Sequence, residues 1–274
     1  MTINCRGKLI NLSSPKVMGI LNITPDSFYS ASRYIVNDTL LKTTEQMLKD
    51  GATFIDVGGY SSKPGAVEIS EAEELKRILP VISLLIAEFP EIIISVDTFR
   101  SKIAQASVEA GAALVNDISG GHLDINMIPT IGKLQVPYIM MHMRGTPQTM
   151  ASMTDYKDLV LEINKYFSEQ IQKCKEHQVM DIIIDPGFGF AKTKAQNFEL
   201  LNKLELLQIV DRPVLAGLSR KSMIYKTLNI DALSALNGTT SLNTIALMKN
   251  ASILRVHDVK EAMECVNLFN QLRK

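Results

Sequence analysis

The chain has 274 residues, 46% hydrophobic and 21% charged, which permits a large core and argues against disorder. Its 29 basic and 29 acidic residues give a formal net charge of zero, unlike a general nucleic-acid binder. Three scattered cysteines in no C-x-x-C pattern indicate reduced thiols. Neither a signal peptide nor an apolar run of about 20 residues is visible, so we expect a cytoplasmic protein without nucleic-acid or membrane partners.

Short apolar runs alternate with helical patterns along the chain. Strands are predicted near 17–22, 53–57, 92–97, 113–117, 137–142, 181–185, 213–217 and 252–256. Helices are predicted near 38–50, 71–88, 100–110, 124–134, 155–177, 196–208, 220–228, 232–248 and 258–272. Eight such repeats predict an α/β protein with a (β/α)8 TIM barrel, a single domain over residues 1–274. The pattern at 232–248 is an extra helix between the seventh and eighth strands.

The connections between these elements carry local signals. The predicted N-caps are Asp38, Ser70, Asp155 and Asp258. Glycines at 51 and 111 stand where helices should end. The loops at 23–37, 58–69 and 143–154 are longer than usual, so we expect them to be lids over the catalytic rim.

Polar side chains end most of the apolar runs, and all strand C-termini of a parallel barrel meet at one rim. A structural protein gains little from such a ring, whereas a small-molecule enzyme needs one. The residues concerned are Asn22, Asp56, Asp97, Asn116, Asp117, Asp185, Arg255 and His257.

Two carboxylates and one amide of this ring suit a heterocyclic ligand. Asp185 can accept two hydrogen bonds from an N–C–N edge such as that of a pterin, or it can serve as an N-cap or barrel salt bridge. Asp97 has the same two interpretations. Because side chains alternate along a strand, we expect Asn116 to face the ligand and Asp117 to be a support residue.

Cationic residues gather after the last two strands. Residues 215–222 run from a strand into a helix start, where backbone N–H groups favour an anion, although a solvated basic turn is the alternative. Arg255 and His257 share one strand face, so both can grip one diphosphate. The carbonyl oxygen of Asn22 can help to hold Mg²⁺ beside it, or Asn22 can simply cap a turn.

Seven segments together resemble the signatures of dihydropteroate synthases, a family of pterin-binding TIM barrels. They are residues 18–28 (MGILNITPDSF), 58–66 (GGYSSKPGA), 97–99 (DTF), 116–120 (NDISG), 185–192 (DPGFGFAK), 217–222 (GLSRKS) and 255–257 (RVH). They span nearly the whole chain. One segment departs from the family, which often has Thr-Arg where this chain has Ser62-Lys63, so the bidentate guanidinium is lost.

The resemblance implies condensation of 6-hydroxymethyl-7,8-dihydropterin diphosphate with 4-aminobenzoate, giving 7,8-dihydropteroate through SN1-like loss of diphosphate. It implies Mg²⁺ as cofactor and a homodimer. The implied catalytic residues are Asp97, Lys221, Arg255 and His257, with Asn22 at the metal. The implied substrate-binding residues are Phe28, Ser62, Lys63, Pro64, Asp97, Asn116, Ile118, Met140, Asp185, Phe190, Gly217, Lys221, Ser222, Arg255 and His257.

Within this set the resemblance implies distinct roles. Asp185 and Lys221 hold the pyrimidine edge of the pterin, Asn116 and Asp97 its other side, and Arg255, His257 and Asn22 the diphosphate. Lys221 and Ser222 hold the benzoate carboxylate. Apolar walls come from Ile118, Met140, Phe190 and Gly217, with Phe28 and Pro64 around the benzoate ring.

Two alternatives stay open at this point. A related barrel could transfer a methyl group from methyltetrahydrofolate to a corrinoid, but it would not need the diphosphate grips at Arg255, His257 and Asn22. A non-catalytic pterin-binding paralogue is the second alternative, and an intact rim argues against it.

Overall fold

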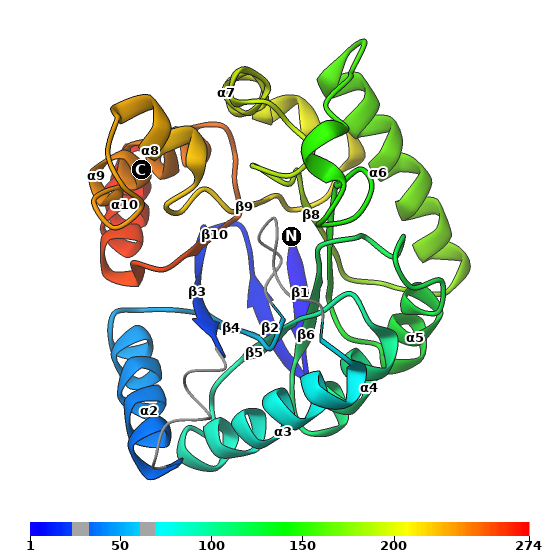
Figure 1. The fold of residues 1–274 in the computed structure, drawn as a ribbon, viewed down its shortest axis with the longest axis vertical. Helices are drawn as coiled ribbons and strands as arrows, with labels where there is room; N and C mark the ends of the chain where they lie inside the picture. The colour runs from blue at the N-terminus through cyan, green and yellow to red at the C-terminus, as the bar shows by residue number, and fades with distance from the viewer. Residues whose placement is uncertain (24–32, 61–68, 274) are drawn as a thin grey trace.

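Eight parallel strands form a barrel in the computed structural model, which describes residues 1–23, 33–60 and 69–273 (Figure 1). The sheet order is β8-β7-β6-β5-β4-β3-β10-β9, and a parallel bridge between Ile184 and Val214 closes it. All eight predicted strands are confirmed. They are β3 (Lys16–Asn22), β4 (Phe54–Gly58), β5 (Ile94–Asp97), β6 (Leu114–Asp117), β7 (Tyr138–Met141), β8 (Ile182–Asp185), β9 (Leu215–Ala216) and β10 (Ile253–Val256).

Helices follow the strands and surround the barrel (Figure 1). The predicted extra helix is confirmed, since two helices rather than one separate β9 from β10. The helices are α2 (Arg33–Lys49), α3 (Glu71–Glu88), α4 (Ser101–Glu109), α5 (Met127–Leu134), α6 (Leu159–Glu176), α7 (Lys194–Asn202), α8 (Ser222–Leu228), α9 (Leu236–Met248) and α10 (Val259–Leu272), with 3-10 turns at Met150–Ser152 and Leu204–Val210. None of the helices in the described ranges is both long and apolar enough to cross a bilayer.

The predicted N-caps had mixed outcomes. Ser70 caps α3 by accepting a hydrogen bond from the backbone N–H three residues later at 3.2 Å. The prediction that Asp38 is an N-cap is wrong, because α2 begins five residues earlier. Asp155 is also wrong, since the carboxylate of Asp158 caps α6. Asp258 occupies the N-cap position of α10, but its side chain makes no cap hydrogen bond.

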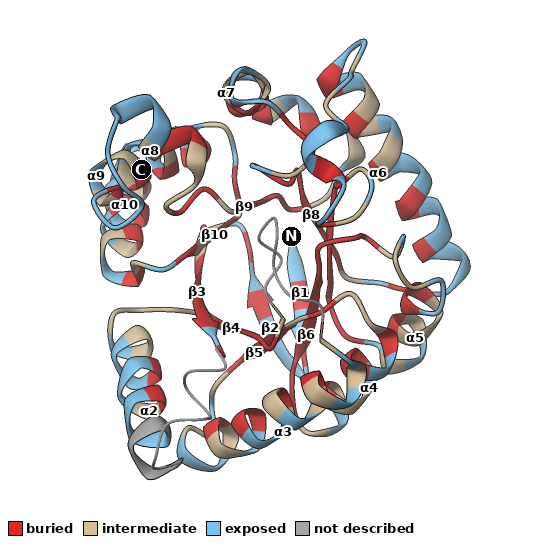
Figure 2. Cartoon of the chain, in the orientation of Figure 1, coloured by how far each residue is buried: buried red, intermediate tan, exposed pale blue. Residues whose placement is uncertain are grey.

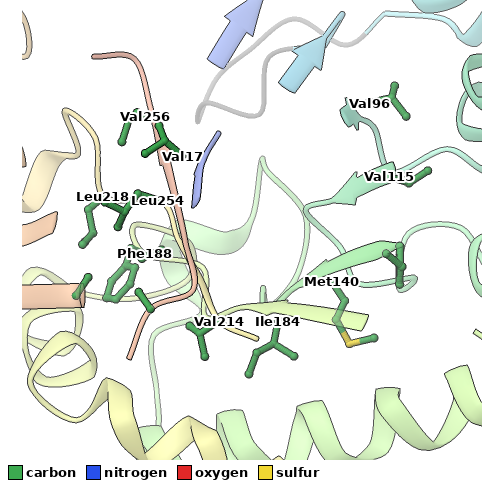
Figure 3. Close-up of a cluster of buried hydrophobic side chains, with 14 of the residues drawn as sticks. Val17, Val96, Val115, Met140, Ile184, Phe188, Val214, Leu218, Leu254 and Val256 are labelled. Atoms are coloured by element: carbon green, nitrogen blue, oxygen red, sulfur yellow. The ribbon is translucent and has the colours of Figure 1, made fainter. Parts of the chain in front are cut away.

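Two apolar layers hold the barrel together. Side chains that alternate outward from the strands pack against the helices, among them Val17, Val96, Val115, Met140 and Ile184 (Figure 3). Side chains that alternate inward form a second cluster that includes Met18, Phe54, Leu114, Ile139, Ile183 and Ile253. The strands are accordingly buried on both faces, whereas the helices expose their outer faces (Figure 2).

An antiparallel hairpin, β1 (Thr2–Cys5) and β2 (Lys8–Asn11), was not predicted. Its two-residue turn places Arg6 and Gly7 at φ +53° and +83°, as a tight hairpin requires. Ile3, Cys5 and Ile10 pack into the inward-facing cluster, so the hairpin plugs the N-terminal end of the barrel. The opposite end, where the strands finish, is therefore the end at which we expect a site.

Candidate active site

The C-terminal mouth of the barrel gathers charged side chains that alternate inward at the ends of the strands. Inward-facing apolar residues lie below them, for example Phe54 two positions before Asp56 and Ile183 two positions before Asp185. The same alternation applies to Asp97, Asn116 and Arg255, the last of which follows the inward-facing Ile253 by two residues.

Arg255 is the centre of a polar network inside the mouth. Its Nε lies 2.6 Å from Oδ2 of Asp56, and its Nη2 lies 2.7 Å from Oδ2 of Asp97. The Asn116 side-chain amide donates to the same Asp56 oxygen at 3.0 Å. The other oxygen, Oδ1 of Asp56, is buried without a partner among the described residues. These contacts join β4, β5, β6 and β10 across the mouth.

Burial and charge set the proton affinities in this network. Burial raises the pKa of Asp97 to about 7, against the opposing effect of the Arg255 guanidinium and with help from the Asp56 carboxylate. Burial lowers the pKa of Arg255, but the carboxylates of Asp56 and Asp97 outweigh it and leave that pKa raised. The guanidinium is therefore a fixed positive charge, while Asp97 can titrate near neutral pH.

A second charged region lies across the mouth on β8 and the loop after β9. Oδ1 of Asp185 accepts the backbone N–H of Gly187 at 2.7 Å. Its Oδ2 lies near Gly217, since a Cβ at Gly217 would be 3.9 Å from this oxygen. Burial lowers the pKa of Lys221 to about 8, although Asp185 opposes the shift. Asp185 thus keeps one oxygen free of protein hydrogen bonds among the described residues, near the half-buried ammonium of Lys221.

The aromatic ring of Phe190 covers that ammonium, with Nζ of Lys221 4.5 Å from the ring centroid. Phe190 and Ile118 belong to an apolar cluster built from the end of β7 and the loops after the strands. Its members are Ile118, Met141, Met143, Met150 and Ala191, with Phe99, Leu123 and Phe190 packed against them. The predicted walls at Ile118 and Phe190 therefore lie together at the mouth.

The prediction for Met140 is wrong. Met140 is fully buried in the layer between barrel and helices (Figure 3). Its neighbour Met141 belongs to the mouth cluster instead. The cause is the two-residue period of the strand, since a shift of one residue moves a side chain to the other face.

The alternation of Asn116 and Asp117 agrees with the prediction. Asn116 joins the polar network inside the barrel. Asp117 points outward, where its carboxylate accepts hydrogen bonds from Ser119, Gly121 and the Tyr138 hydroxyl. Asp117 is therefore a support residue that shapes the loop after β6.

Several predicted residues lie at the outer edge of the mouth. His257 is exposed, and its Nδ1 lies 3.0 Å from Oγ of Ser219. Ser222 begins α8 directly after Lys221, and Asn22 ends β3 with an exposed side chain. Arg220 does not add to an anion site there, because its guanidinium forms two hydrogen bonds with Asp258. Four predicted residues, Phe28, Ser62, Lys63 and Pro64, lie outside the described residues.

Two residues received no role in the sequence analysis. Asp56 ends its strand as Asp97 and Asp185 do, so the signal was present, but its link to Arg255 joins residues 199 positions apart. Lys192 is buried, and its ammonium binds the loop after β8. Lys192 ends the segment 185–192 that resembles a family signature, but no feature of the local sequence predicts that its side chain is buried.

Residues 18–257 match the family described as pterin binding enzyme. The chain is 39% identical to dihydropteroate synthase of Escherichia coli over 270 residues, which cover 98% of this chain and 95% of that protein. It is 43% identical to dihydropteroate synthase of Synechocystis over 250 residues, which cover 90% and 86%.

Solved structures give the same result. Dihydropteroate synthase of Yersinia pestis in a complex with a sulfonamide drug has a TM-score of 0.93 and 40% identity, over 100% of this chain and 99% of that one. The Xanthomonas albilineans enzyme with 4-aminobenzoic acid has a TM-score of 0.91 and 33% identity, over 99% and 98%. The chain belongs to the pterin-binding enzyme family. Within that family it belongs to the dihydropteroate synthases, which are transferases.

Proposed function

We propose that the mouth of this barrel binds 6-hydroxymethyl-7,8-dihydropterin diphosphate and joins it to 4-aminobenzoate, giving 7,8-dihydropteroate and diphosphate. One observation supports this most directly. Asp185 keeps a carboxylate oxygen open beside the ammonium of Lys221, opposite the network of Arg255 and Asn116. An acceptor, a donor and an amide at one end of the barrel match the mixed edges of a pterin ring.

The reaction breaks the bond between the pterin methylene carbon and the diphosphate oxygen, and the electron pair leaves with diphosphate. The SN1-like cation that remains is delocalised into the dihydropterin, and the ionised form of Asp97 can stabilise it. The amine nitrogen of 4-aminobenzoate then bonds to the methylene carbon and loses a proton. Arg255 supplies positive charge for the departing diphosphate. His257, exposed at the outer mouth, can donate a ring N–H to it.

The benzoate is expected to bind between the pterin pocket and the outer rim. The ammonium of Lys221 and the hydroxyl of Ser222 are adjacent in sequence at the start of α8, so both can reach one carboxylate. Phe190 lies against the same ammonium and offers its ring to the benzoate ring. Phe28 and Pro64, the other predicted ring contacts, rest on the sequence alone.

The mouth offers Mg²⁺ a protein oxygen ligand, which is enough if waters and the substrate phosphates supply the others. No cluster of three His, Cys, Asp or Glu ligands occurs within residues 1–23, 33–60 and 69–273. Asn22 offers one exposed amide oxygen at the end of β3. Mg²⁺ commonly takes one or two protein oxygens and completes its shell with waters and substrate phosphates. When bound, the ion would neutralise charge on the leaving diphosphate.

The homodimer and the cytoplasmic location are also proposals. Exposed apolar side chains on the adjacent helices α9 and α10 support self-association, since such residues favour burial against a partner. They are Ile245, Met248, Leu268 and Leu272. Light scattering of the purified protein tests the dimer. All three cysteines are free thiols, as expected in the cytoplasm.

Diphosphate release tests the proposed reaction. Purified protein with dihydropterin diphosphate should release diphosphate much faster when 4-aminobenzoate and Mg²⁺ are present, and dihydropteroate should form in equal amount. Asp185→Ala should weaken binding of a bare pterin by about 1.5–3 kcal/mol, because it removes a charged acceptor. A folded wild-type protein that binds pterin without turnover would instead be a non-catalytic paralogue.

A further inference from the structure

A buried ammonium lies directly behind the pterin pocket. Nζ of Lys192 lies 3.0 Å from the carbonyl oxygen of Phe190, 3.1 Å from that of Gly187 and 3.1 Å from Nδ1 of His142. An ammonium has three N–H donors, and these three acceptors use all of them. Lys192 is 8% exposed, and burial lowers its pKa to about 7, against the opposing effect of the Asp185 carboxylate. The three acceptors favour the protonated form, because a neutral amine has only two N–H donors for them.

We propose that Lys192 is a positioning residue for the pterin site, whose ammonium fixes the loop 186–191 against Asp185 and Lys221. This inference rests on the proposed function of the mouth as a pterin site. The hydrogen-bond partners of Lys192 are two carbonyl groups of the loop and His142, so it would act through the loop.

The backbone conformation of this loop turns two carbonyl groups inward, where they need a hydrogen-bond donor. Gly187, Gly189 and Ala191 have φ of +69°, +81° and +48°, so left-handed residues alternate along it. Ala191 is not a glycine, and this conformation costs free energy that other contacts must offset. The carbonyl groups of Gly187 and Phe190 turn inward to Lys192. Without the ammonium, both would lose a donor in a poorly solvated place.

The same loop sets the two charged groups of the pterin pocket. The N–H of Gly187 binds Oδ1 of Asp185, which leaves Oδ2 for a ligand. The Phe190 ring covers Nζ of Lys221, and a Cβ at Gly189 would lie 3.4 Å from Cδ of Lys221. A displaced loop would therefore move the Asp185 carboxylate and uncover Lys221.

His142 is suited to its part as an acceptor. Its ring packs edge-on against Tyr166 with centroids 4.9 Å apart, and also contacts Tyr156 and Phe167. Burial holds the pKa of His142 well below its usual range, so the imidazole is neutral. In the tautomer with the proton on Nε2, Nδ1 accepts a hydrogen bond from the ammonium. A protonated imidazole here would repel Lys192.

Fluorescence can report the loop directly, because the chain contains no tryptophan. Phe190→Trp places a single tryptophan on the loop, and excitation at the long-wavelength edge of its absorption separates its emission from that of the tyrosines. In this background, Lys192→Met keeps most of the side-chain length and removes the charge. We expect its emission to shift to the red and its affinity for 6-hydroxymethylpterin to fall roughly 10- to 100-fold, as for loss of charged hydrogen bonds. Lys194→Met, an exposed neighbour on α7, is the matched control and should change neither.

Chemical rescue separates positioning from a general role in folding. Lys192→Ala leaves space for a small cation, so ethylammonium should restore both the emission and the pterin affinity, whereas ethanol should not. The proposal is overturned if Lys192→Met binds pterin as Lys194→Met does, or if ethylammonium restores neither property. It is also overturned if Lys192→Ala folds only when ethylammonium is present, because the cation then serves the whole fold. These binding measurements stand even if the wild type releases no diphosphate, which would count only against the proposed reaction.

Discussion

Arg255 reaches over β3 to Asp56, with Nε 2.6 Å from Oδ2, although β10 and β4 are not neighbours in the sheet. The Asp56 side chain of this pair is 0% exposed, whereas the Arg255 side chain is 20% exposed. A carboxylate in that position cannot be satisfied by water, so the guanidinium is required by the fold as well as by any ligand.

The first prediction concerns this ion pair. Asp56→Ala should lower the free energy of unfolding by about 3–5 kcal/mol, because Arg255 and Asn116 then lose a buried partner. Urea denaturation measures the change. The exposed pair between Lys8 and Glu91, 3.4 Å apart, gives the control, and Glu91→Ala should cost about 0–1 kcal/mol. Equal costs for the two substitutions would contradict a structural role for Asp56.

The second prediction concerns the pH dependence of stability at Asp97, whose pKa burial raises from 3.8 to about 7. A carboxyl with a raised pKa binds its proton more tightly in the folded protein. Its contribution to stability is therefore full below pH 3.8 and is lost as the pH rises through about 7. The stability of the wild type relative to Asp97→Asn should fall across this interval. Parallel stability curves for the two proteins would refute the assignment.

Activity should respond to Asp97 in the opposite direction. Only the ionised carboxylate carries the negative charge that can stabilise the pterin cation, so the rate should rise with pH around 7 in the wild type. Asp97→Asn should be slower and lack this limb. Initial rates under saturating substrates, measured from pH 5 to 9, distinguish the two profiles. An unchanged acidic limb in Asp97→Asn would assign it to another group.

The third prediction separates Arg255 from His257. His257 is exposed at the outer mouth, so His257→Ala should weaken the binding of dihydropterin diphosphate. The binding of bare pterin should stay nearly unchanged. Arg255→Ala should weaken the binding of both ligands by about 1.5–3 kcal/mol or more, because Asp97 and Asp56 lose their shared partner. Calorimetry with each ligand measures this. If Arg255→Ala spared bare pterin, Arg255 would serve the diphosphate alone.

Much of the barrel could be predicted because its strands are buried on both faces, which gives short continuous apolar runs with a polar residue at the end. The same property placed Asp97, Asn116, Asp185 and Arg255 at one mouth. The N-terminal hairpin was missed because its strands are short and half-exposed, and because Arg6 is an unusual residue for a left-handed turn position.

Contacts between distant segments could not be derived in this way. The pairing of Arg255 with Asp56 depends on how β4 and β10 are placed around β3, which no local pattern encodes. Lys192 is a similar case, since its burial results from the carbonyl groups of a loop whose backbone is left-handed at alternate residues. Such residues become recognisable only when the loop geometry is known.

The last prediction tests the one-residue register error at β7. Met140 packs between barrel and helices, so Met140→Ala should cost about 2–5 kcal/mol of stability and leave pterin affinity unchanged in the folded protein. Met141 belongs to the mouth cluster with Ile118, so Met141→Ala should also lower pterin affinity, by about 1–3 kcal/mol. Thermal unfolding and pterin titration of both variants give the two readouts. A larger affinity loss for Met140→Ala than for Met141→Ala would mean that Met140, and not Met141, forms the pocket wall.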